Sequence, residues 1–408
     1  MASDRLVLTN ANVIDCVGER PLAGASVVIE RGRIGEVLDG RRSPDTRNAD
    51  VIDLDGMYLL PGLWDVHIHP DYLAGVSAVD QTIAFGHRLM EALTEAGVVG
   101  MRCAGAAHFM DVAWKHAFET GQYVGPRLFA AGHFLTTTGG HFLTSGHALE
   151  CDGPYGFVRA IREQIKHGVD HIKLNLTGGI MGPSWDRHWH SFLLEDELEA
   201  AFAICRARGV PVMAHATNPA AVKAAVRLGA HSVEHGYMMD AECVERLRAT
   251  NTWYVPTLAI SHLTPDQASD PWEKRWIEQR NLSADLCERA DKAAGEHREW
   301  FQRALAAGVR MALGSDIRPL KDAALLELGL WVKAGATARQ ALLAATRDAA
   351  ALCGVGAMLG TIEPGKLADL IAVAADPLQD ITNLRTLRLV FKEGRLVADH
   401  RAGARSVR

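Results

Sequence analysis

Two histidines, His67 and His69, stand two residues apart at the end of an apolar run that begins near residue 59. Residues i and i+2 of a strand point to the same face, so both imidazoles would converge on one point. Imidazole nitrogens suit zinc and related divalent ions, and a coordination position left open to water makes such a site catalytic. A His-x-His pair alone serves equally well as two hydrogen-bonded side chains, so this interpretation depends on the rest of the chain.

Three later strand-like segments also end on a side chain that can bind a metal. His215 follows residues 211–214, His235 follows residues 232–234, and Asp316 follows residues 311–315. Core packing does not by chance place histidine or aspartate at the carboxyl ends of several strands. The seven cysteines contain no Cys-x-x-Cys pair, which argues against a closed structural zinc site. We therefore expect a catalytic metal centre.

A lysine, Lys173, lies within the apolar segment that starts at His171. Burying a lysine is costly unless it is paired or chemically altered. Alone, Lys173 is read most simply as a strand-end lysine whose ammonium group reaches solvent. The alternative is a lysine carboxylated by carbon dioxide, whose new carboxylate bridges two cations, and the surrounding candidate ligands favour this second interpretation.

These motifs occur in an order that resembles the amidohydrolase superfamily, in its dinuclear branch with a carboxylated lysine. Within that branch the chain looks like dipeptidase-like, imidazolonepropionase-related enzymes that act on Xaa-Pro or Xaa-Arg substrates. The resemblance covers nearly the whole chain and rests on residues 65–69, Lys173, His215, residues 234–236 and residues 314–316. It implies two divalent metal ions, with zinc favoured: one held by His67, His69 and Asp316, the other by His215 and His235, and carboxylated Lys173 bridging both.

Such a centre supports hydrolysis. Two cations about 3.5–4 Å apart lower the pKa of a shared water and polarise a carbonyl. Asp316 would act as general base toward the bridging hydroxide and then as acid toward the leaving group. We expect cleavage of a C–N amide bond in a dipeptide or N-acyl amino acid. Hydrolysis of an aryl amide, urea, carbamate or lactone is the alternative, and a catalytically silent barrel that only binds a ligand is a more distant one.

Candidate substrate contacts lie near these motifs. His141 ends a Gly-Gly-His turn, and the resemblance implies that it polarises the substrate carbonyl, although a turn histidine bonded to backbone is the simpler alternative. Tyr237 follows the His235 motif, and the glycine-rich loop at 177–190 carries Trp185 and Arg187. Thr217 stands where some dipeptidases of this type carry a carboxylate-binding tyrosine, and this departure makes a strict dipeptidase less certain.

The pattern of elements predicts an α/β fold, a (β/α)8 TIM-type barrel with a small β-sandwich built from both chain ends. Short alternating strands indicate the sandwich at residues 1–58 and 361–408, around a barrel at residues 59–360. Barrel strands are expected to start near residues 59, 98, 127, 171, 211, 232, 253 and 311. Helices are expected at 195–208, 218–228 and 337–353, each followed by glycine. Residues 264–303 are expected to form extra helices with a solvated face and no binding role.

Composition narrows the classes of partner. A net charge of −6 and a pI near 6.3 give no basic surface for nucleic acid, so none is expected. The chain shows no signal-like start and no apolar run of about 18 residues, which predicts a cytoplasmic protein without a membrane partner. Scattered cysteines of odd number fit reduced thiols. The expected partner is a small-molecule substrate, and assembly into homo-oligomers stays open.

Overall fold

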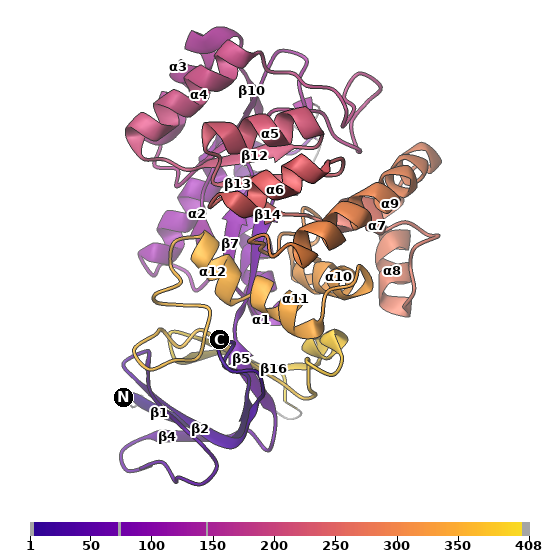
Figure 1. The fold of residues 1–408 in the computed structure, drawn as a ribbon. Coiled ribbons are helices and arrows are strands. Elements are labelled where there is room, and N and C mark those ends of the chain that lie inside the picture. The colour runs from indigo at the N-terminus through magenta and orange to yellow at the C-terminus, as the bar shows by residue number, and fades with distance from the viewer. Residues whose placement is uncertain (1–3, 72–74, 144–145, 402–408) are drawn as a thin grey trace.

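The computed structural model describes residues 4–71, 75–143 and 146–401. It consists of a parallel α/β barrel and a β-sandwich at one end, where both described chain ends lie (Figure 1). The α/β barrel with a sandwich from both ends, expected from the sequence, is confirmed.

The sandwich centres on one eight-stranded sheet in which N-terminal and C-terminal strands are neighbours. Its order is β17-β16-β15-β5-β1-β2-β3, with β4 paired to β1. Antiparallel pairing of β15 with β5, from Leu370↔Pro61 to Val373↔Tyr58, joins the two chain ends. The strands are β1 (Arg5–Val13), β2 (Leu22–Glu30), β3 (Arg33–Leu38), β4 (Asp50–Asp53), β5 (Tyr58–Pro61), β15 (Leu370–Val373), β16 (Leu387–Lys392) and β17 (Arg395–Asp399).

This sheet reaches Pro61, so the apolar run that begins at residue 59 is shared between the sandwich strand β5 and the first barrel strand, which starts at Leu63. The domain limits 1–58, 59–360 and 361–408 stay a prediction.

The barrel strands are short, and apart from β8 and β10 they are buried on both faces, as expected for a parallel sheet covered by helices. One sheet has the order β6-β7-β8 and the other β10-β9-β11-β12-β13-β14. The strands are β6 (Leu63–Ile68), β7 (Val98–Cys103), β8 (Arg127–Phe129), β9 (Phe134–Thr136), β10 (Ala148–Glu150), β11 (Ile172–Asn175), β12 (Val212–Ala216), β13 (Ser232–His235) and β14 (Trp253–Val255).

The eighth predicted strand, near Met311, is only a single bridge to Tyr254. Its backbone nevertheless closes the barrel. The amide of Ala312 donates to the Tyr254 carbonyl over 3.2 Å, and the Leu313 carbonyl accepts from the Val66 amide over 2.9 Å. The segment 311–316 therefore connects β14 to β6.

Helices surround the barrel and are α1 (Ala78–Ala96), α2 (Met110–Glu119), α3 (Gly153–Lys166), α4 (Glu195–Arg208), α5 (Pro219–Leu228), α6 (Ala241–Ala249), α7 (Ala259–His262), α8 (Pro271–Arg280), α9 (Ala284–Ala306), α10 (Leu320–Lys333), α11 (Ala338–Ala344) and α12 (Arg347–Leu352), with 3-10 turns η1 (Ala107–Phe109) and η3 (Ile381–Thr386). Helices α4 and α5 end at Gly209 and Gly229 in left-handed conformations, as predicted. Helices α8 and α9 confirm the extra helices expected at 264–303.

The single helix expected at 337–353 is wrong, because α11 and α12 are separate. The carbonyls of Ala344 and Ala345 accept hydrogen bonds from Leu313 and Trp64 in the barrel, over 3.0 and 2.7 Å. Thr346, at φ −135° and ψ −89°, is outside the helical region. Barrel closure therefore interrupts this helix.

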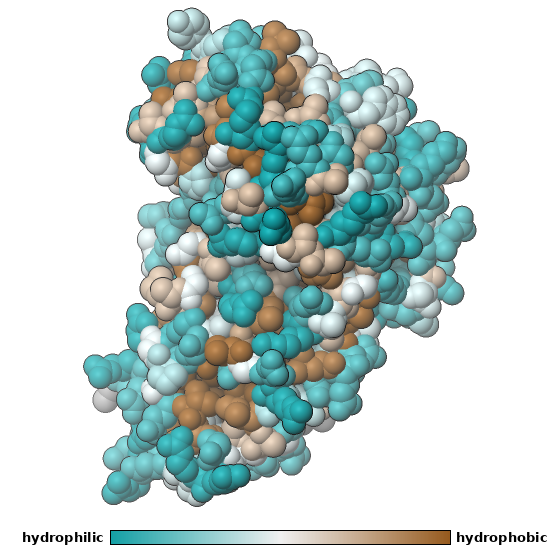
Figure 2. Space-filling model, viewed as in Figure 1, coloured by the Kyte–Doolittle hydropathy of each residue, from teal (hydrophilic) through white to brown (hydrophobic). Residues whose placement is uncertain are grey.

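Polar residues cover most of the face seen in Figure 2, with a hydrophobic group toward the sandwich end. Within the described residues, no helix is both long and apolar enough to cross a bilayer.

A buried carboxylate joins the sandwich to the barrel and yields a stability prediction. Asp369, with its side chain 1% exposed, lies 2.5 Å from Lys392 Nζ and 3.2 Å from Arg127 Nε of β8. Asp369→Asn removes the carboxylate partner of the buried Lys392 ammonium and one of the two carboxylates that bind Arg127, which keeps Glu393. We therefore expect a loss of about 3 kcal/mol of unfolding free energy, at the low end for breaking a buried ion pair. Urea denaturation measures it.

Asp45→Asn is the matched control, because Asp45 pairs with Arg47 on the exposed surface and exposed pairs contribute little. Equal effects of the two substitutions on the denaturation midpoint would contradict the structural role of Asp369.

Candidate metal centre

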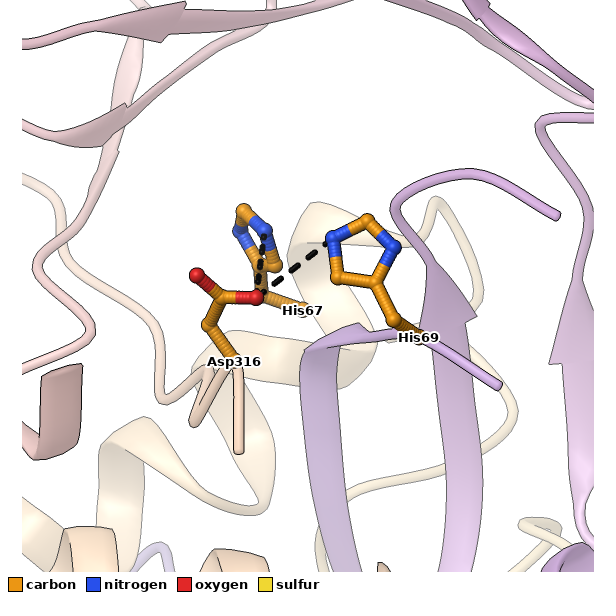
Figure 3. A group of neighbouring side chains, drawn as sticks. All are labelled: His67, His69 and Asp316. Carbon is orange, nitrogen blue, oxygen red and sulfur yellow. Dashed lines mark ion pairs between the residues drawn. The ribbon is translucent and has the colours of Figure 1, made fainter. Parts of the chain in front are cut away.

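Three ligand-type side chains converge at the carboxyl end of β6. One atom from each of His67, His69 and Asp316 lies within 4.8 Å of the others. Asp316 Oδ1 is 3.7 Å from His67 Nε2 and 3.4 Å from His69 Nε2 (Figure 3). The two imidazoles share a face of the strand, as the i, i+2 spacing predicts. Asp316 is brought to them by the closing segment, since its amide donates to the His67 carbonyl over 2.9 Å.

Hydrogen bonds behind the two imidazoles decide which nitrogen faces the centre. His67 Nδ1 lies 2.7 Å from Glu234 Oε2, and His69 Nδ1 lies 3.0 Å from the Gly105 carbonyl. Each Nδ1 therefore carries the donated hydrogen, and each Nε2 keeps a lone pair for a ligand-binding role. Glu234 is itself held by Arg102 over 2.9 Å, so the first histidine is fixed by a buried chain of charges.

His215 and His235 extend the group of imidazoles. Their ring centroids are 4.4 Å apart, and the His235 ring is 4.9 Å from that of His67. His215 Nε2 is 2.9 Å from the Gly178 carbonyl, and His235 Nδ1 is 2.7 Å from Thr257 Oγ1. The opposite nitrogen of each ring is thus left for the centre, Nδ1 of His215 and Nε2 of His235.

Backbone conformation is unusual at two of the candidate ligands. His235 and Asp316 have φ values of 73° and 56°. Non-glycine residues rarely adopt this left-handed region, and such conformations cluster at functional sites.

Lys173 lies in the same group. Its side chain is buried, and Nζ is 3.5 Å from His67 Nε2. Burial lowers the pKa of Lys173 to about 8, against the charges of Glu234 and Asp316, which raise it. Within the described parts of the chain, Lys173 makes no ion pair.

The electrostatics of the group fit a divalent cation. Burial first, and neighbouring positive charge second, lower the pKa of all four imidazoles well below the usual value, so they are neutral and able to bind metal. Burial raises the pKa of Asp316 to about 6. Neutral imidazoles and a carboxylate sharing one buried point form the donor set of zinc and similar ions.

His141 lies beside these residues, stacked on His215 with ring centroids 4.3 Å apart. Its Nδ1 is 2.8 Å from a carboxylate oxygen of Asp186, leaving Nε2 for another partner. Burial opposes ionisation of Asp186, but hydrogen bonds from His141, Phe142 and Gly179 outweigh it and lower the pKa of its carboxyl. The sequence analysis missed Asp186, although this residue stands between the candidate substrate contacts Trp185 and Arg187.

A cavity of about 320 Å³ opens above the candidate ligands. Its polar lining includes His69, His141 and Asp316, with Tyr237 among them. Burial raises the pKa of the Tyr237 phenol well above its usual value, so the hydroxyl stays neutral. The apolar lining is contributed by Phe142, Ile180, Met181, Ile260, Leu282 and Leu286. This space suits a small substrate with an apolar part.

The other predicted contacts lie elsewhere. Trp185 is 45% exposed, and Arg187 lines a neighbouring cavity of about 310 Å³. The hydroxyl of Thr217 is buried against Thr177 Oγ1, 2.7 Å away, and helps to hold the loop. None of the three is among the described residues that line the main cavity, and their role in substrate binding stays a prediction.

The expectation that residues 264–303 present only a solvated face is wrong. Arg280, Leu282 and Leu286 line the main cavity. Arg289 of α9 donates to the carbonyls of Ile180 and Gly182, over 2.8 and 2.6 Å, and so fixes the loop that carries Asp186. A polar stretch gives no sequence signal for this role, because the contacts depend on how α8 and α9 pack over the barrel.

The chain belongs to the amidohydrolase family, whose family model matches residues 58–397. It is therefore a hydrolase, as the sequence predicts, and the silent-barrel alternative loses support.

Several relatives agree with this assignment. The chain is 29% identical to ochratoxinase from Aspergillus niger over 381 residues, covering 83% of this chain and 75% of the relative. It is 24% identical to imidazolonepropionase from Rhizobium rhizogenes over 402 residues, covering 88% and 89%. The crystal structure of a Xaa-Pro dipeptidase with methionine bound in its active site superposes with a TM-score of 0.84 at 27% identity, covering 96% of this chain and 99% of the other.

Removal of metal tests the centre directly. We expect a strong chelator to lower the thermal unfolding temperature, because a ligand bound only by the folded state stabilises it, by about 2.7 kcal/mol when its free concentration is 100 times Kd. Added zinc should restore the transition, as followed by differential scanning calorimetry.

The double variant His69→Ala, Asp316→Ala should respond much less to chelator and to zinc, because it lacks two of the three converging side chains. A response equal to that of the unaltered protein would place the metal elsewhere.

Proposed function

We propose that this hydrolase cleaves a C–N amide bond in a small substrate, a dipeptide or an N-acyl amino acid. The observation that carries the proposal is the convergence of His67, His69 and Asp316 within 4.8 Å, beside a cavity that His69 and Asp316 line together with six apolar side chains. The relatives support it, since a Xaa-Pro dipeptidase is among the similar structures.

The proposed centre holds two divalent ions, with zinc favoured. His67, His69 and Asp316 would hold one, His215 and His235 the other, and a carboxylated Lys173 both. Lys173 supports this assignment through its position, because Nζ is buried 3.5 Å from a candidate ligand without a carboxylate partner among the described residues. Carboxylation would turn this buried cation into an anionic ligand, which removes the cost of an unpaired buried charge.

When bound, such ions lower the pKa of water and polarise a carbonyl. Asp316 would accept a proton from the attacking water and give it to the leaving nitrogen.

His141 would act on the carbonyl oxygen. The Asp186 carboxylate accepts a hydrogen bond from Nδ1 and so fixes the orientation of the ring. A hydrogen donated from Nε2 to the carbonyl oxygen would stabilise the charge that develops there as the carbonyl is attacked. Stacking on His215 keeps this donor beside the metal ligands.

A less polar substrate is the second candidate. The apolar lining from Ile180, Met181 and Ile260 would also accept an aryl amide, urea, carbamate or lactone. Turnover of such compounds, without turnover of N-acyl amino acids or dipeptides, would favour this alternative.

Replacing Asp316, the proposed general base, separates its role in proton transfer from its role in metal binding. For Asp316→Asn we expect kcat to fall about 10²–10⁴-fold, the usual contribution of general acid–base catalysis. Much of the metal should remain, because the histidines are intact. Initial rates on N-acyl amino acids and dipeptides, with elemental analysis of the same samples, measure both quantities, and an unchanged kcat would remove Asp316 from this role.

Isotope labelling tests whether Lys173 is carboxylated. Protein prepared with ¹³C-bicarbonate should show a carbamate carbon signal in its NMR spectrum and about two metal equivalents. Lys173→Ala should lose the signal, at least one metal equivalent and turnover. Lys166→Ala is the control, because Lys166 lies on the exposed surface of α3. A Lys173→Ala protein with full metal and activity would exclude the bridging lysine.

A further inference from the structure

An arginine with an unused donor faces the cavity. Arg280 is the last residue of α8 and lines the same space as Asp316 and His141. Its Nη1 is fully buried and has no hydrogen-bond partner among the residues that the structure describes. The guanidinium lies over a ring, with Cζ 5.2 Å from the centroid of Trp276. Buried guanidinium donors are normally satisfied, so this group is prepared for a partner from outside the chain.

The charge of Arg280 persists at neutral pH. Burial first, and the charge of Arg318 second, lower its pKa to about 10, which still leaves the side chain protonated. Arg318 lines the cavity too, and its nearest described carboxylate is Asp71, 3.9 Å away. Of the described lining residues, Asp316 is the one carboxylate. If Asp316 binds a metal ion as proposed, its negative charge compensates that ion and not the charge of Arg280.

We propose that Arg280 binds the carboxylate of the amino-acid part of the substrate. This inference rests on the proposed amide hydrolysis and narrows it to substrates whose leaving group is a free amino acid. A planar guanidinium matches a carboxylate with two parallel hydrogen bonds. The pairing would supply the anion that the buried donor lacks.

The neighbouring side chains indicate what that amino acid carries. Leu282 and Leu286 line the cavity directly after Arg280 in the chain, and Ile260 lines it as well. An amino acid held by its carboxylate at Arg280 would therefore place an apolar side chain among these residues. The substrate class is an N-acyl or N-aminoacyl derivative of an apolar amino acid.

Two other candidates for the carboxylate site are less suited. Thr217 already shares its hydroxyl with Thr177 and the loop backbone. Arg187 lines the neighbouring cavity and is not among the described residues that line the cavity above the candidate ligands.

Binding of L-methionine and L-methioninamide to the metal-loaded protein tests the proposal without turnover. By isothermal titration calorimetry, we expect methionine to bind more tightly than its amide. Arg280→Met should weaken methionine binding about 30-fold, the effect of losing a charge-assisted hydrogen-bonded pair, and should leave methioninamide binding unchanged. Arg280→Lys should recover part of the affinity. Arg275→Met is the matched control, since Arg275 is exposed on the same helix and should behave as the unaltered protein.

Each outcome decides the proposal. Equal affinity of the unaltered protein for the two probes, no binding of either, or equal losses for both in Arg280→Met would overturn it. The kinetics of N-acetyl-L-methionine hydrolysis separate this inference from the proposed function. Turnover with the same KM in Arg280→Met would sustain amide hydrolysis and reject the carboxylate contact. Arg280-dependent methionine binding without any turnover of N-acyl or dipeptide substrates would sustain the contact and reject the hydrolysis.

Discussion

Closure of the barrel by the segment 311–316 is the constraint on which the centre depends. This segment is too irregular to count as a strand, yet it hydrogen-bonds to β14 on one side and to β6 on the other. The side chain of Asp65 strengthens the join, because it accepts hydrogen bonds from the amide and hydroxyl of Ser315 over 3.0 and 2.5 Å. Burial raises the pKa of Asp65 to about 7. Asp316 meets the two histidines of β6 only because this last connection fixes its backbone.

A chain of buried polar side chains lies beside the closing segment and ends at the candidate ligand His67. Arg102 of β7 binds Glu234 of β13, and Glu234 binds His67 of β6. Breaking such a buried chain by removing one member typically costs about 3–5 kcal/mol. These contacts therefore stabilise the packing of β6, β7 and β13 and also orient the candidate ligand His67. A substitution that disturbs Glu234 would affect folding and the centre together.

Local pattern explains what could be predicted from the sequence. The i, i+2 spacing of His67 and His69 and the glycines after α4 and α5 depend on a few consecutive residues, and the structure agrees there. The resemblance to the amidohydrolase family extended the prediction to the barrel and the sandwich. The break between α11 and α12 was not predictable in this way, because it arises when barrel amides capture the carbonyls of Ala344 and Ala345. Asp186 reaches His141, and Arg280 reaches the cavity, through the packing of distant segments, which a single sequence does not reveal.

The attachment of α9 to the loop above the cavity has an evolutionary consequence. Arg289 holds the carbonyls of Ile180 and Gly182, and that loop carries the aspartate that orients His141. The insert containing α8 and α9 supplies none of the candidate metal ligands. Mutation in the segment of α8 and α9 can therefore reshape the pocket and shift His141 in one step, while the candidate metal ligands stay untouched. Divergence toward new substrates within this architecture would accumulate first in this segment.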